Sequence, residues 1–265
     1  MILNPLSINS MKKMFVFVVL FFSIQVLKAQ ETSDSKALEI ADKVMEAMGG
    51  QKAWDNTRHI TWNFFGARRL TWDKWSGNVR IDNLRDNSVT LLNINTETGR
   101  VYKWGAEQTN PDSLKKYIKA GKGAWINDSY WLTMPFKLKD NGVTLKYLGE
   151  GKTDEGKDAY NLQLTFKEVG NTPNNMYKIW VEKESNLMTQ WSYYAKSTDD
   201  KPGFTRPWTE YKSYGKVLLS GERGDRDLTE IKVFEALPES IYTDFKKPDF
   251  SKAKDYNKKK DKIEF

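Results

Sequence analysis

The amino-acid sequence predicts a mainly β (α+β) protein built from about ten antiparallel strands and two helices. Short runs of residues alternate between apolar and polar side chains, which is the two-residue period of a half-buried strand. Turn-forming residues link these runs over a few positions, as in hairpins. Helical spacing of apolar residues is confined to two segments that do not alternate with the strands, which argues against a parallel α/β sheet.

The first element is a helix over residues 36–48. Alanine, valine and methionine side chains recur there at intervals of three and four residues, which places them on one face. The glycine pair at 49–50 follows directly and favours termination of the helix. Beyond it the period changes to two, and a meander of five strands is expected at 60–64, 70–72, 79–81, 89–95 and 100–104.

A second helix is predicted to begin after Asn110, which is a good cap, with Pro111 at its first position. Gly121 is expected to end it, and residues 123–136 are expected to form an irregular insertion rich in aromatic side chains. Alternation then resumes, which predicts further strands at 143–148, 160–166, 177–182, 187–194, 208–214, 216–221 and 229–234.

The N-terminal residues 1–29 have the pattern of a cleavable signal peptide. Lys12 and Lys13 precede an apolar run at 14–24, and Leu27 and Ala29 suit the −3 and −1 positions of a cleavage site. The run is shorter than a membrane-spanning helix. The sequence has no cysteine, so neither disulfides nor a lipid anchor at the cleavage site is expected. We therefore expect a soluble protein of the Gram-negative periplasm.

The positive net charge of +7 is concentrated at the two ends of the chain. Residues 246–265 are rich in lysine and poor in apolar side chains, which predicts a flexible tail. Residues 30–245, the expected folded domain, contain equal numbers of basic and acidic residues. A neutral domain argues against a nucleic-acid-binding surface.

Few residues point to catalysis or to a metal. With one histidine and no cysteine, the sequence predicts no metal site and no cofactor. His59 opens a strand without a nucleophile motif beside it, and we interpret it as structural. The acidic residues of 222–230 are interleaved with arginines and are interpreted as a solvated turn. A hydrolase with a pair of carboxylates remains open, because the separation of two acids cannot be read from sequence.

Aromatic residues are the most informative feature, at 13% of the chain with ten tryptophans. Large rings occur in both phases of the strand alternation, so one ring-bearing face should be covered by the helices and the aromatic insertion. Tyrosine and tryptophan combine an apolar body with a polar tip, which suits amphiphiles and sugar rings. The residues expected to line a ligand cavity are Trp62, Phe64, Trp72, Trp131 and Trp191.

The order of elements resembles the outer-membrane lipoprotein-sorting carriers. The similar parts are RRLTWDKWSGNVRIDN, SVTLLNINTETGRVYKW and the closing LPESIYTDF. More narrowly, WINDSYWLTMPFKLKDNGV is similar to a segment of an uncharacterised exported family common in Bacteroidetes. The resemblance implies a curved antiparallel half-barrel with helices on its concave face, over an apolar cavity.

The function expected on these grounds is that of a non-enzymatic periplasmic carrier of a lipophilic or amphiphilic ligand, such as an acyl chain. The resemblance leaves room for a membrane-associated partner protein. The alternative is a periplasmic glycan-binding module that uses the same rings as platforms.

Overall fold

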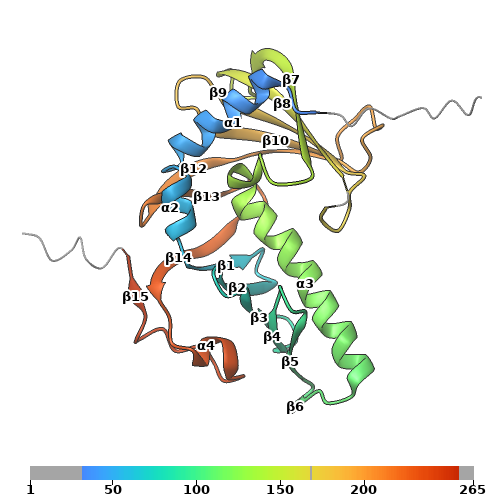
Figure 1. Cartoon of the computed structure of the whole chain (residues 1–265), viewed down its shortest axis with the longest axis vertical. Coiled ribbons are helices and arrows are strands. Elements are labelled where there is room, and N and C mark those ends of the chain that lie inside the picture. Colours follow the sequence, from blue (N-terminus) through green and yellow to red (C-terminus); the bar gives the residue numbers. More distant parts are fainter. Residues whose placement is uncertain (1–31, 168, 257–265) are drawn as a thin grey trace, which may run out of the picture. The chain divides into compact units, whose positions relative to one another are not determined.

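The computed structural model describes residues 32–256 except residue 168 (Figure 1). The expected signal peptide at 1–29 and residues 257–265 lie outside this part. The predicted fold class, mainly β with antiparallel sheets and helices, is confirmed. The described residues form fifteen strands in three sheets, which is more than the ten or so strands expected. Among these residues, no helix has the length and apolar character needed to cross a bilayer.

The largest sheet has eight strands in the order β15-β14-β1-β2-β3-β4-β5-β6, each antiparallel to its neighbours. The predicted meander forms its centre. The strands of the whole sheet are β1 (His59–Phe64), β2 (Arg68–Asp73), β3 (Asn78–Asn83), β4 (Val89–Asn93), β5 (Thr98–Lys103), β6 (Ala106–Glu107), β14 (Leu228–Ala236) and β15 (Lys254–Asp255). The two-residue strands β6 and β15 are too short to show alternation in the sequence.

The second half of the chain supplies two smaller antiparallel sheets. The five-stranded sheet, in the order β11-β10-β9-β8-β7, consists of β7 (Val143–Lys152), β8 (Asp158–Phe166), β9 (Met176–Glu182), β10 (Met188–Tyr194) and β11 (Phe204–Pro207). The two-stranded sheet pairs β12 (Thr209–Tyr214) with β13 (Val217–Glu222).

Two short helices precede the large sheet. The predicted N-terminal helix is present as α1 (Ser35–Ala47), and Gly49 follows with a φ of 112°. That backbone region suits glycine, as the helix end requires. The next helix, α2 (Gln51–Asn56), was not expected, because six residues show no complete helical period.

The long helix α3 (Pro111–Thr133) begins as predicted, since the side chain of Asn110 accepts a hydrogen bond from the Ser113 amide. The expected end at Gly121 is wrong. A Cβ atom at Gly121 would lie 3.0 Å from Cγ2 of Thr90 on β4, so the glycine allows the helix to approach the sheet closely. The expected irregular insertion at 123–136 is therefore mostly the second half of α3, followed by the short 3-10 helix η1 (Met134–Lys137).

The large sheet has one apolar and one polar face, and both are covered. Helix α3 crosses the strands on the apolar face (Figure 1), where Ile118 packs beside Gly99 of β5. On the polar face lies the C-terminal segment that contains α4 (Ser240–Thr243). Arg80 of β3, 1% exposed, donates hydrogen bonds to the carbonyl oxygens of Asp244 (2.6 Å) and Lys246 (2.8 Å). A buried arginine thus holds this segment on the sheet.

The expected domain boundary at 245 and the expected flexible tail at 246–265 stay predictions, and residues 257–265 lie outside the described part. Within the described part of the tail, β15 pairs with β14, and the ring of Phe250 stacks on Phe234 with the centroids 5.5 Å apart. The hydroxyl of Tyr256 donates to the carbonyl oxygen of Asn56 at 3.2 Å. These contacts give residues 246–256 defined partners in the fold.

Candidate functional site

A groove lies where the second half of α3 faces the loop between β8 and β9. It consists of two adjoining hollows of about 80 Å³ and about 260 Å³. The residues that line both are Ile126, Tyr130, Phe166, Val169 and Gly170. Together the hollows slightly exceed the lower end of the range for small-molecule sites, about 300 Å³. We call this feature the α3 groove.

The local structure explains why these side chains meet. Ile126 and Tyr130 are four residues apart, so they lie one above the other on the same face of α3. Phe166 ends β8, and Tyr177 lies at the start of β9. The connecting loop is tied to the helix by Asn171, whose Nδ2 donates to the carbonyl oxygen of Gly123 at 2.8 Å.

The lining of the groove is amphiphilic. Aromatic and aliphatic side chains dominate, and polar side chains such as Asn127, Thr172 and Asn175 border the smaller hollow. At the larger hollow, Lys137 and Asp140 form an exposed ion pair at 2.9 Å. An apolar lining with a few polar groups is typical of sites for ligands that have both an apolar body and a polar end.

Tyr130 is the most unusual side chain in this lining. Its hydroxyl is buried and has no hydrogen-bond partner among the described residues. Its ring contacts those of Phe166 and Tyr177, with centroid distances of 6.1 Å and 5.5 Å. Burial, followed by the nearby Tyr177, raises the pKa of Tyr130 well above its usual value. The group is therefore a neutral hydroxyl at physiological pH and can donate a hydrogen bond.

A second unpartnered donor borders the larger hollow. Trp125 lines it from α3, and its indole N–H has no acceptor in the described part of the chain. Its ring meets that of Trp72 edge-on at 5.2 Å. Buried donors without partners are rare in folded proteins, and each calls for an explanation. Two of them, Trp125 and Tyr130, border this groove.

Three of the five predicted cavity residues lie on the large sheet. Trp62, Phe64 and Trp72 share the apolar face of β1 and β2, as their alternation predicts, and all three are buried in the hydrophobic core. Phe64 contacts Trp131 at a centroid distance of 6.2 Å. These three side chains are absent from the lining of the α3 groove. Their role in ligand binding stays a prediction.

The other two predicted residues meet each other. Trp131 lies on α3, and its ring contacts that of the fully buried Trp191 on β10 edge-on at 4.7 Å. Of the five residues, Trp131 is the one that lines the groove. The structure thus joins Phe64, Trp131 and Trp191 into one aromatic cluster at the inner side of the site.

Sequence reasoning missed Ile126, Tyr130 and Val169. The helical spacing of Ile126 and Tyr130 was the signal that could have identified the first two, but the expected end of the helix at Gly121 concealed it. Val169 lies in a loop, where no periodicity reports burial.

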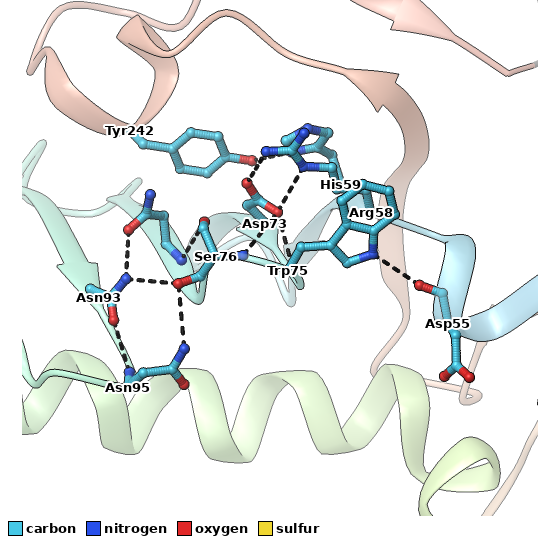
Figure 2. Close-up of polar contacts among 10 residues, drawn as sticks. Asp55, Arg58, His59, Asp73, Trp75, Ser76, Asn93, Asn95 and Tyr242 are labelled. Atoms are coloured by element: carbon cyan, nitrogen blue, oxygen red, sulfur yellow. Dashed lines mark hydrogen bonds and ion pairs between the residues drawn. The ribbon is translucent and has the colours of Figure 1, made fainter.

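A cluster of polar side chains lies on the opposite face of the large sheet, and Figure 2 shows its arrangement. The Nδ1 atom of His59 and the hydroxyl of Tyr242 are 2.8 Å apart. Asp73 accepts hydrogen bonds from Nε and Nη2 of Arg58, at 3.1 and 2.9 Å, and from the amide of Trp75 at 3.1 Å. The cluster joins the first strands of the sheet to α4.

Burial and hydrogen bonds shift the pKa values of His59 and Asp73 in this cluster. Burial lowers the pKa of His59 to about 4, so the imidazole is neutral at physiological pH. Burial opposes ionisation of Asp73, but hydrogen bonds from Arg58 and Ser76 outweigh it and lower the pKa of that carboxyl. The carboxylate is already occupied by an arginine and backbone amides. The interpretation of His59 as structural stays a prediction.

The described residues contain no group of three or more histidine, cysteine, aspartate or glutamate side chains placed to hold a metal ion. The expected solvated turn at 222–230 contains an ion pair between Asp225 and Arg206. Arg223 is fully buried, with its guanidinium carbon 3.4 Å from the centre of the Trp208 ring. Its Nη2 donates to the carbonyl oxygen of Trp131 at 2.8 Å, so this residue ties α3 to the β13–β14 turn.

Comparison with known proteins adds little to the site. No protein-family model matches the chain, and no curated protein sequence matches it. The structure is similar to that of a DUF1329 family protein from Desulfovibrio piger, with 13% sequence identity and a TM-score of 0.43. The alignment covers 78% of this chain and 96% of the other. The function must therefore be argued from the geometry of the site.

Proposed function

We propose that this protein is a non-enzymatic binding protein for an amphiphilic ligand, which it holds in the α3 groove. The ligand would place an apolar chain against the aromatic and aliphatic lining and a hydrogen-bond acceptor near Tyr130. A fatty acid or another acyl-bearing molecule has this chemistry. The expected signal peptide would deliver the protein to the periplasm, where such a carrier could act.

One observation carries the proposal: the hydroxyl of Tyr130 is buried in the wall of an otherwise largely apolar groove and has no partner among the described residues. Burying a hydroxyl without a hydrogen bond costs about 1–3 kcal/mol. A ligand acceptor at this position would offset that cost. The apolar neighbours Phe166 and Val169 offer a surface for a hydrocarbon chain.

The test is a titration of the purified protein with a dansyl-labelled fatty acid, followed by fluorescence. The parent protein should show saturable binding, and unlabelled fatty acid should displace the probe. Ile126→Glu places a carboxylate in both hollows and should weaken binding at least about tenfold, because the charge would be desolvated by the acyl chain.

Ser213→Glu is the matched control, since it introduces the same side chain at an exposed position on β12, none of whose residues lines either hollow. It should bind the probe as the parent does. Absence of saturable binding by the parent, or equal affinity in both variants, would refute the proposal. Displacement of the probe by a soluble oligosaccharide would favour the glycan alternative, and cleavage of an acyl ester probe would favour the hydrolase.

A further inference from the structure

Trp104 has a conformation and an exposure that the fold does not explain. It is 75% exposed, at the tip of the hairpin between β5 and β6. Lys103 pairs with Ala106 across this hairpin, so Trp104 and Gly105 form a two-residue turn. Both have positive φ angles, 55° and 81°. Turns of this type favour asparagine followed by glycine, and a bulky side chain in the left-handed region is an outlier.

Trp104 therefore projects a large ring into solvent from a backbone conformation that is strained for its side chain. Strained residues cluster at functional sites, where the surrounding structure holds them in place. The hairpin supplies that support, because the hydroxyl of Tyr102 donates to the carbonyl oxygen of Gly105 at 2.8 Å. An exposed ring held in this way suits contact with something outside the protein.

A second exposed apolar side chain lies at the same end of the sheet. Leu84 is 40% exposed in the turn between β3 and β4. The strand register places this turn beside the β5–β6 hairpin, because Val89 pairs with Asp82 on one side and with Tyr102 on the other. An ion pair between Asp86 and Lys103 links the two turns.

Basic side chains lie near Trp104 on the neighbouring helix α3. The ring of Trp104 meets that of Tyr117 on α3, with the centroids 6.4 Å apart. Around Tyr117, Lys115, Lys116 and Lys119 are exposed, and within the described part of the chain none has a carboxylate in ion-pair distance. We call Leu84, Trp104, Lys115, Lys116 and Lys119 together the basic tip.

The acidic groups near the basic tip are largely neutralised. Glu107 forms an ion pair with Arg100, and Asp86 forms one with Lys103. Asp112 in the first turn of α3 is the remaining acid on this part of the helix. The surface therefore combines exposed apolar side chains with an excess of positive charge.

We propose that the basic tip binds the surface of an anionic lipid bilayer. Tryptophan prefers the boundary between lipid headgroups and acyl chains, and exposed lysines are attracted to anionic headgroups. The tip is separate from the α3 groove, since none of its residues lines either hollow. This proposal therefore stands whether or not the groove binds a ligand.

The decisive variant is Trp104→Asn, because asparagine is favoured at this turn position and relieves the strain. Its melting temperature should equal or exceed that of the parent. Its binding to sedimented vesicles of phosphatidylglycerol and phosphatidylethanolamine should fall about tenfold, as expected for loss of one inserted ring. Lys115→Gln with Lys119→Gln should also weaken binding, by about fivefold for each charge, and added salt should weaken binding by the parent.

Trp75→Ala is the matched control, because Trp75 is also exposed, at 59%, but lies in the turn between β2 and β3 at the opposite end of the sheet. It should bind vesicles as the parent does. The parent and all variants carry the same N-terminal segment, so any contribution of that segment to vesicle binding is equal in all of them. Failure of the parent to bind anionic vesicles at low salt would overturn the proposal, and so would unchanged binding by Trp104→Asn.

Discussion

Replacement of Tyr130 by phenylalanine removes one buried oxygen atom and leaves the ring contacts with Phe166 and Tyr177 in place. Because the hydroxyl has no partner among the described residues, its removal breaks no hydrogen bond within them. An unpartnered buried polar group costs about 1–3 kcal/mol. The free energy of unfolding of Tyr130→Phe should therefore rise by up to about that amount. In a domain of this size the melting temperature should rise by about 2–4 °C for each kcal/mol.

Ligand binding should change in the opposite direction. If the Tyr130 hydroxyl donates to the ligand, its loss removes one hydrogen bond, with a net contribution of about 0.5–1.5 kcal/mol. The dissociation constant of the dansyl fatty acid should then increase by about twofold to tenfold. Thermal unfolding followed by circular dichroism and a probe titration measure the two effects on the same preparations.

Tyr211 provides the matched control, since its hydroxyl donates to the carbonyl oxygen of Met188 at 2.8 Å. Tyr211→Phe makes the same chemical change but breaks that bond, so it should lower stability by about 1 kcal/mol and leave probe affinity unchanged. If Tyr130→Phe lowered stability as much as Tyr211→Phe and left probe binding unaltered, the reasoning about the unpartnered hydroxyl would be refuted.

Two further predictions concern the core and the polar cluster. Trp62→Ala should lower the free energy of unfolding by about 3–5 kcal/mol, as for a packed ring. Trp131→Ala at the groove should lower it clearly less and should weaken probe binding. Equal losses of stability in urea unfolding, with probe binding unchanged, would contradict the distinction. His59 has a pKa of about 4 when folded against 6.5 as its ordinary value, so below pH 6.5 the unfolded chain takes up a proton that the folded chain does not. The resulting loss of stability should grow as the pH falls and reach about 3 kcal/mol near pH 4. His59→Gln should lose correspondingly less stability than the parent between pH 7 and pH 4. If the free energy of unfolding of the two proteins fell in parallel over this range, protonation of His59 would not be a cause of the loss.

The strands of the large sheet could be predicted because their sequence carries the relevant physics. Ile60, Trp62 and Phe64 alternate with polar residues, and one face of β1 does lie in the core as that pattern requires. The pattern could not show that the other face is buried as well. On that face a distant C-terminal segment contacts β1 through Tyr242 and His59, and Arg80 holds the segment through long-range hydrogen bonds. Such contacts leave no local periodicity.

The predicted end of the second helix was wrong for a related reason. Gly121 was interpreted as a helix end because glycine favours termination, yet its role is to bring α3 close to Thr90. Local propensity cannot distinguish these two uses of glycine, since they differ only in what lies on the other side of the residue. The error hid the helical face that carries Ile126 and Tyr130, and with it the groove.

The abundance of tryptophan predicted large rings inside the protein but could not separate a packed core from a ligand site. The structure supplies a sharper criterion in the polar tips of those rings. The indole N–H groups that are buried without partners in the described part of the chain belong to Trp62, Trp72, Trp125, Trp191 and Trp208. In a core made only of hydrocarbon neighbours, phenylalanine or leucine would fill the same space without this cost. Of these donors only Trp125 borders the α3 groove, together with Tyr130, so these are the two groups that the proposed ligand would meet and that the variants above test.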